Sequence, residues 1–134
     1  GTENIALQWF EDGKVVIGDV TSPGNYKLYV EEGILTEHIK VALHGTADWA
    51  DYVFEDNYDL KSLEEVAAHI EVNGHLHNTP SAAALVADGG VELKSATVNQ
   101  QEKIEELFLH LIDMNERLKA LEEENAALKA SLQD

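Results

Sequence analysis

The residues whose types and spacing most suggest chemistry are the two histidines of His75-Leu76-His77, which could bind a metal ion. Alternate residues of an extended segment point to the same side, so both imidazoles would face one way. Three copies of the pair around an axis would present six nitrogens, a set suited to an octahedral transition metal. The alternative is one hydrogen-bonded loop histidine and one exposed histidine. We favour this alternative, because the loop follows a predicted helix and need not approach an axis, and we expect no metal and no cofactor.

A second group of candidate binding residues is aromatic. Trp49, Tyr52 and Tyr58 lie within ten positions of one another and could form a surface on which a glycan stacks. Aromatic side chains at this density also serve as core, where each buries a large apolar area. Both interpretations remain open at the level of the sequence, and core is the commoner role.

Motifs that would indicate catalysis are missing from the sequence. It has no glycine-rich phosphate loop, no metalloprotease helix and no nucleophile elbow. It also has no cysteine, which removes thiolate nucleophiles, thiolate metal sites and disulfides together. We predict that the protein is not an enzyme.

Charge excludes further classes of partner. The 134 residues carry 26 acids and 9 bases, for a formal net charge of −17. The bases form no cluster of the kind that binds phosphate backbones, so we expect no nucleic acid partner. Unbroken apolar runs such as 82–87 are far shorter than the ~20 residues that cross a bilayer, so we expect no membrane insertion.

The strongest pattern in the chain is a heptad repeat near its end. Apolar residues recur there at alternating spacings of three and four over four heptads, which predicts a coiled coil and not the broader stripe of a helix on a globular core. We expect the coiled-coil helix over 97–134, with Thr97 and Gln100 as a capping box at its start. The a positions are Ile104, Leu111, Leu118, Asn125 and Leu132, and the d positions are Leu107, Met114, Leu121 and Leu128.

Residues beside the repeat predict how the helices associate. Arg117 at g can reach Glu122 at the next e of a neighbour only if the helices run parallel and in register. Asn125 is a polar residue in an apolar seam, a device that fixes register. Residues 117–122 also match the Arg-h-x-x-h-Glu pattern of short trimeric coiled coils. We predict a parallel homotrimer; the alternatives are a dimer and a lone helix folded back on its own domain.

The rest of the chain must position this helix. Residues 1–44 show alternating apolar residues separated by turn clusters and predict a β-rich segment, intertwined between copies, with its clearest strand at 35–43. Residues 45–96 predict a small head with short helices. Ser62 and Glu65 form a capping box before one helix, which Asn73-Gly74 ends. Pro80-Ser81 opens a second helix that stops at Gly89-Gly90. The expected fold class is α+β.

A set of ordered sequence blocks also resembles a known family. They are Gly13-Lys14-Val15-Val16-Ile17-Gly18, Thr21-Ser22-Pro23, Tyr26-Lys27-Leu28, Gly33-Ile34-Leu35, Trp49-Ala50-Asp51-Tyr52-Val53-Phe54, Tyr58-Asp59-Leu60, Ser62-Leu63-Glu64-Glu65-Val66, Asn73-Gly74-His75-Leu76, Thr79-Pro80-Ser81-Ala82 and Lys103-Ile104-Glu105-Glu106-Leu107. Together they resemble the C-terminal region of tail-fibre-domain proteins of Bacteroidetes bacteria and their phages. This chain departs from that pattern at 77–80, where the family usually has Pro-Gly-Ile-Pro.

The resemblance implies a structural role. It implies the C-terminal end of a trimeric tail-fibre-like or adhesin protein, extracellular or on a virion or injection device, whose coiled coil drives assembly. Such domains are distantly similar to the self-cleaving chaperone domains of phage tail spikes, whose Ser-Asp start is missing here. The alternative function is a receptor-binding tip that contacts a cell-surface glycan or protein, with Trp49, Tyr52 and Tyr58 as the candidate contacts.

Overall fold

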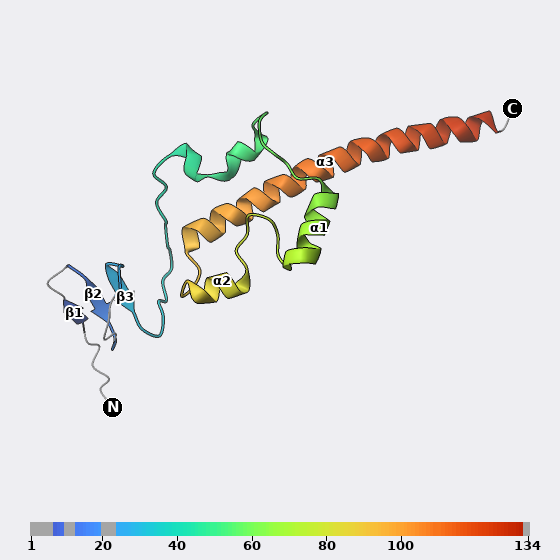
Figure 1. Ribbon diagram of the computed structural model, residues 1–134. Helices are drawn as coiled ribbons and strands as arrows, with labels where there is room; N and C mark the ends of the chain where they lie inside the picture. Colours follow the sequence, from blue (N-terminus) through green and yellow to red (C-terminus); the bar gives the residue numbers. More distant parts are fainter. Residues whose placement is uncertain (1–6, 10–12, 20–23, 133–134) are drawn as a thin grey trace. The chain divides into compact units, whose positions relative to one another are not determined.

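The chain combines a small β-sheet with helices and ends in one long helix, which agrees with the predicted α+β class (Figure 1). The computed structural model describes residues 7–9, 13–19 and 24–132. It divides into two compact units, Gly1–Lys40 and Val41–Asp134.

The first unit contains a three-stranded sheet. Its strands are β1 (Leu7–Trp9), β2 (Val15–Ile17) and β3 (Leu28–Val30), in the order β1-β2-β3. The first two are antiparallel, as the turn sequence before Val15 predicts, whereas β3 runs parallel to β2. Val16 in the central strand is completely buried, so this residue is the centre of the small core of the sheet.

The strand expected at 35–43 is absent from the single chain, and that prediction is wrong for one copy. Residues 34–43 form neither a helix nor a ladder, and the apolar side chains of Leu35, Ile39, Val41 and Leu43 are exposed. A strand needs a neighbour to pair its backbone groups, and the described part of this chain supplies none here. The intertwined β-region therefore stays a prediction about several copies.

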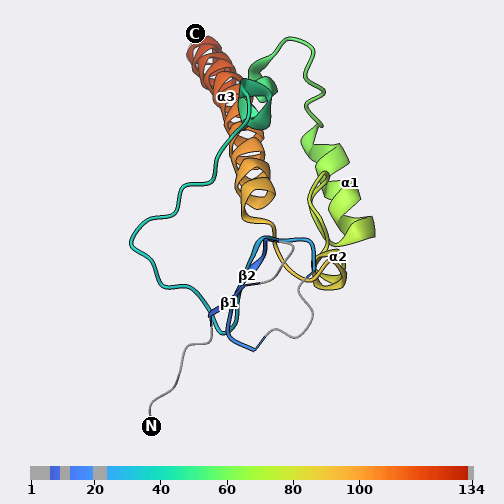
Figure 2. The ribbon, with the colours of Figure 1, turned by 90° about the vertical axis from the view of Figure 1, so that its left-hand side faces the viewer.

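The second unit is built around the long helix. It contains the 3-10 helices η1 (Thr46–Asp48) and η2 (Ala50–Phe54), followed by α1 (Leu63–Asn73), α2 (Ala82–Ala87) and α3 (Leu93–Ser131). The helix η2 packs directly on α3, and its Ala50 and Val53 are the buried apolar residues of the unit (Figure 2). None of the described helices is both long and apolar enough to cross a bilayer.

Local signals place α1 and α2 as predicted. The Ser62 hydroxyl accepts from the Glu65 amide at 3.2 Å, and the Glu65 carboxylate accepts from the Ser62 amide at 2.8 Å. These bonds close the capping box, and Gly74 ends α1 in the left-handed conformation at φ 73°. Ser81 caps α2, which stops before Gly89 and Gly90, both at positive φ.

Helix α3 begins earlier than predicted. Its N-cap is Glu92, whose carboxylate accepts from the amides of Lys94 and Ser95 at 3.1 and 2.7 Å. The predicted cap, Thr97, lies inside the helix and donates to the Leu93 carbonyl at 2.8 Å. A carboxylate at this end interacts favourably with the helix dipole, which a neutral hydroxyl does less well. At 39 residues, α3 is roughly 58 Å long, and its C-terminal half extends beyond the other elements of its unit (Figure 1).

Replacing the cap of α1 provides a first test. We expect Ser62→Ala to lower the free energy of unfolding by about 1 kcal/mol, because the Glu65 amide loses the hydroxyl that accepts its hydrogen bond. Ser62→Thr keeps the hydroxyl and should lose little. Urea unfolding followed by circular dichroism measures both; equal midpoints for Ser62→Ala and the unmodified chain would contradict the role of the cap.

Candidate functional site

Helix α3 turns its heptad seam away from its own chain. Every apolar a and d side chain is exposed in the part of the chain that the structure describes, with between 47% and 84% of its surface accessible. These residues are Ile104, Leu107, Leu111, Met114, Leu118, Leu121, Leu128 and Leu132. The helix is therefore not folded back with its seam on its own head, which leaves the seam available to other copies.

The opposite face of α3 is charged and buried. Glu102, Lys103, Glu105 and Glu106 are each at most 9% exposed, although charged side chains are almost never buried unless they are paired. This inverts the usual arrangement, in which a surface helix buries its apolar stripe and exposes its charges. The head is thus attached to α3 through polar contacts as well as through the buried Ala50 and Val53 of η2.

The centre of that attachment is the ammonium group of Lys103. It lies 2.8 Å from Glu102 Oε1, 2.9 Å from Glu106 Oε2 and 3.1 Å from His77 Nε2. Two tyrosines complete the group, which we call the polar cluster. Its members are Tyr52, Tyr58, His77, Glu102, Lys103 and Glu106.

The tyrosines connect the segment 50–58 to the two carboxylates. The Tyr52 hydroxyl donates to Glu102 Oε2, and the Tyr58 hydroxyl donates to Glu106 Oε1 at 2.5 Å. The two rings lie 6.0 Å apart, in a tilted arrangement that lets them pack on each other. One edge of the helix is thereby fixed by two side chains from the same short segment.

The same contacts change the acidities of these groups. Burial, followed by the hydrogen bond to Glu102, raises the pKa of Tyr52 to about 12. The pKa of Tyr58 is also raised, again by burial first and then by its bond to Glu106. For Glu106, burial alone would raise the pKa, but hydrogen bonds from Tyr58 and Lys103 outweigh it and hold the pKa below its ordinary value. The carboxylate is stabilised as an anion and both phenols as neutral donors.

The candidate metal ligands His75 and His77 both have contacts within this region. His77 Nε2 lies 3.2 Å from Glu106 Oε1, while His75 Nδ1 lies 2.9 Å from the Leu76 carbonyl. The ring of His69 contacts both, at centroid distances of 5.5 Å to His75 and 6.4 Å to His77. No three histidine, aspartate or glutamate side chains of the described residues come together as ligands for a metal ion.

The loop that carries His77 is fastened to α3 by an amide. Asn99 donates through Nδ2 to the Asn78 carbonyl at 2.9 Å and accepts from the Thr79 hydroxyl at 3.0 Å. Asn78 adopts a left-handed backbone at φ 53°. These bonds hold His77 at the polar cluster.

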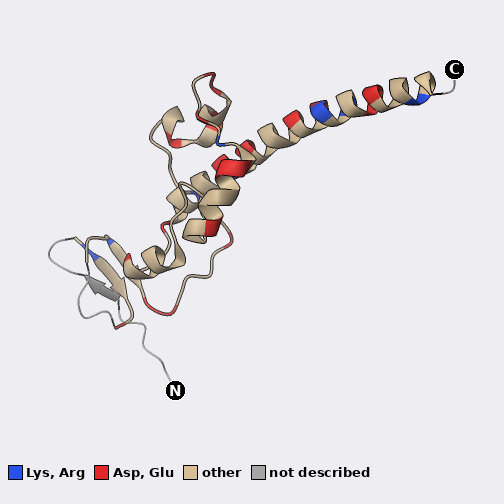
Figure 3. Ribbon diagram, turned by 45° about the vertical axis from the view of Figure 1, so that its right-hand side comes forward, with Lys and Arg blue, Asp and Glu red and all other residues tan. Residues whose placement is uncertain are grey.

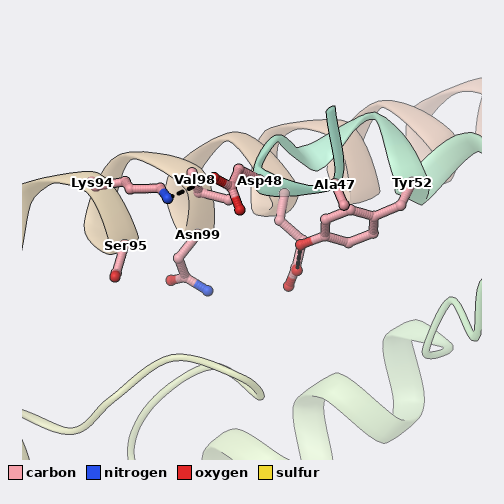
Figure 4. Close-up of a pocket in the computed structure, with 8 residues that line it drawn as sticks. Ala47, Asp48, Tyr52, Lys94, Ser95, Val98 and Asn99 are labelled. Carbon is pink, nitrogen blue, oxygen red and sulfur yellow. Dashed lines mark hydrogen bonds and ion pairs between the residues drawn. The ribbon is translucent and has the colours of Figure 1, made fainter. Parts of the chain in front are cut away.

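A second ion pair fastens the start of the head. Asp48 accepts from the Lys94 ammonium at 2.8 Å, across a cleft of about 310 Å³ that also contains Ser95, Asn99 and Tyr52 (Figure 4). The Lys94 hydrogen bond holds the pKa of Asp48 below its ordinary value. Both side chains are about 30% exposed, so the pair contributes to position more than to stability.

Of the candidate glycan-binding aromatics, Tyr52 and Tyr58 contact each other within the head. The hydroxyls of Tyr52 and Tyr58 are occupied by Glu102 and Glu106, so these rings are structural parts of the head. Trp49 is half-buried between η1 and η2 and makes no ring contact with either tyrosine among the described residues. No local sequence pattern marks Glu102, Lys103 and Glu106 as a group, because charged positions outside the seam of a coiled coil are normally solvated.

The ammonium at the centre of the polar cluster can be tested directly. We expect Lys103→Met to lower the free energy of unfolding by about 3 kcal/mol, because two buried carboxylates lose their counter-ion. The matched control is Lys119→Met, which removes an exposed lysine from the same helix and should change stability little. Denaturant unfolding measures the free energy of unfolding of both variants. Equal decreases for the two would contradict the role of Lys103 at the centre of the polar cluster.

The raised phenol pKa values predict a loss of stability in alkali. A group whose pKa is higher in the folded state holds its proton more tightly there, so its contribution is complete below pH 10 and disappears as the pH rises through about 12. Tyr52→Phe and Tyr58→Phe remove this linkage. Their unfolding midpoints should fall less steeply than those of the unmodified chain in this pH range; parallel curves would contradict the prediction.

In comparisons with protein-family models, curated proteins and solved structures, none matched the chain.

Proposed function

We propose that this chain is a non-enzymatic assembly module at the C-terminal end of a trimeric tail-fibre-like or adhesin protein. The single observation that carries the proposal is the exposed heptad seam of α3, on a helix whose charged residues between 102 and 106 are already covered by its own head. An apolar stripe of this length, regular in its spacing and uncovered, is suited to parallel copies of itself.

The free energies expected for the two kinds of contact indicate which of them drives the association. Burying the exposed half of one leucine-sized side chain stabilises by roughly 1 kcal/mol, so the eight apolar seam residues contribute on the order of 8 kcal/mol per chain. An exposed pair such as Arg117 with Glu122 adds only a few tenths of a kcal/mol. The seam therefore supplies the affinity, while the charged pairs select orientation.

Three strands are favoured over two by the residues beside the seam. Arg117 and Glu122 stand at the g and e positions of a trimer pattern. Within one chain, Arg117 lies 3.7 Å from Asp113 in an exposed pair that competes weakly with a partner on a neighbouring copy. Charges of both signs follow the outer part of α3 (Figure 3), and Asn125 at a aligns the copies.

The identity of the larger assembly rests on the ordered blocks that resemble tail-fibre-domain proteins. They support an extracellular location or a place on a virion or injection device, with a β-region before the coiled coil. The receptor-binding alternative has less support, because the hydroxyls of Tyr52 and Tyr58 are used inside the head.

A matched pair of charge insertions tests the seam. We expect the unmodified chain to have the mass of three chains, and Leu118→Asp at an a position to lower it to one, because three carboxylates would meet in the seam. Ala120→Asp places the same charge at an exposed c position two residues away and should leave the trimer intact.

Light scattering coupled to size exclusion at several concentrations gives the masses. A monomeric unmodified chain would overturn the proposal, and a stable mass of two chains would overturn its stoichiometry alone.

A further inference from the structure

A small apolar pocket lies beside the seam, between α1 and α3. Its volume is about 80 Å³, and its apolar walls come from Leu63 and Val66 of α1, Leu76 of the following loop and Leu107 of α3. Leu63 and Leu107 are 45% and 57% exposed, so the mouth of the pocket is not covered by its own chain.

The pocket opens along one defined edge of the coiled coil. Its remaining walls on α3 include Lys103 and His110, which are both g positions when Ile104 is at a. In a parallel coiled coil, each g residue faces the e residue five positions further along on the neighbouring helix. The rule that pairs Arg117 with Glu122 therefore brings position 108 of a neighbour opposite Lys103.

The residue at that position is Phe108. It is the only phenylalanine, tyrosine or tryptophan on α3, and 58% of its surface is exposed in the single chain. The other e positions of the helix carry Lys94, Gln101, Asn115, Glu122 and Lys129, as expected for an edge in contact with water. Phe108 lies beside the exposed seam residues Ile104 and Leu111 on the helix surface, so it extends their apolar patch, and a contiguous patch of this kind marks a partner surface.

The chemistry of the pocket favours such a ring over a polar ligand. Its charged wall residues Lys103 and Glu106 are paired with each other at 2.9 Å, so they offer no unpaired charge to a ligand. The volume is smaller than the ~150 Å³ of an apolar cavity that accepts benzene. The ring would therefore enter by one edge and cover Leu63 and Leu107 at the mouth with the rest of its surface.

We propose that Phe108 of each chain inserts into the pocket between α1 and α3 of the neighbouring chain. The inference rests on the proposed parallel assembly and adds the head to its interface. In a trimer, three such insertions form a closed ring around the coiled coil, so α1 and the loop after it hold the helix of the next copy.

Cysteine pairs in a chain that has no native cysteine provide the test. One chain carries Phe108→Cys and a large tag; the other carries Leu63→Cys and a small tag. The two are co-expressed, purified through both tags and treated with a short bis-maleimide. Ile112→Cys replaces Phe108→Cys in the control, because Ile112 is another exposed apolar residue of α3 but lies at a b position.

We expect a covalent heterodimer from the Phe108→Cys combination and at least tenfold less from the Ile112→Cys control. An oligomer of the expected mass with no cross-link, or with equal cross-linking in the control, would overturn the insertion and leave the assembly proposal standing. A monomeric mass would overturn both. Phe108→Ala should also lower the melting temperature of the trimer by several degrees more than Ile112→Ala, and equal shifts would count against the insertion.

Discussion

The arrangement of the second unit depends on one buried ammonium group. Lys103 neutralises two carboxylates of its own helix, and these in turn accept hydrogen bonds from Tyr52 and Tyr58. Desolvation of charges offsets much of what such contacts gain, so a buried ion cluster is weak evidence for stability. The cluster instead determines which face of α3 the head packs against. An apolar head could pack on the seam as readily as another helix does, whereas a head built on these hydrogen bonds fits only the charged face.

The features predicted from the sequence are those specified by residues close together in the chain. The heptad spacing, the capping box at Ser62 and the turn before Val15 depend on a few neighbouring positions, and each correctly indicated a helix, a helix start or a hairpin. The polar cluster could not be found in this way. Tyr52 and Glu102 are fifty positions apart, and nothing in either local pattern shows that they meet.

Two errors have identifiable causes. A hydroxyl with a glutamine three residues later predicts a helix start at Thr97, yet the carboxylate of Glu92 lies five residues earlier and caps two amides. The prediction of a strand at 35–43 rests on alternation alone. Alternation describes which side chains share a face, but a ladder also requires a partner, which the described part of a single chain lacks.

The loop 77–80 combines a left-handed backbone with a contact to α3. It begins with His77 and Asn78. Asn78 adopts the left-handed backbone that glycine adopts most easily, and asparagine is among the residues that tolerate it best. His77 then supplies an imidazole to the polar cluster. Asn78 thus makes the turn, and His77 adds a contact to α3.

The attachment of the head along the first half of α3 also has a kinetic consequence. Starting a helix is the slow and unfavourable step in forming it, since several residues must be ordered before the first hydrogen bond closes, and each further residue then adds easily. In this chain the segment from Glu92 to Glu106 is held as helix by contacts within one copy. Chains that meet therefore already carry a helical template from which the outer turns can propagate. In the proposed assembly, their encounter rate, and not helix initiation, would then limit how quickly an oligomer forms.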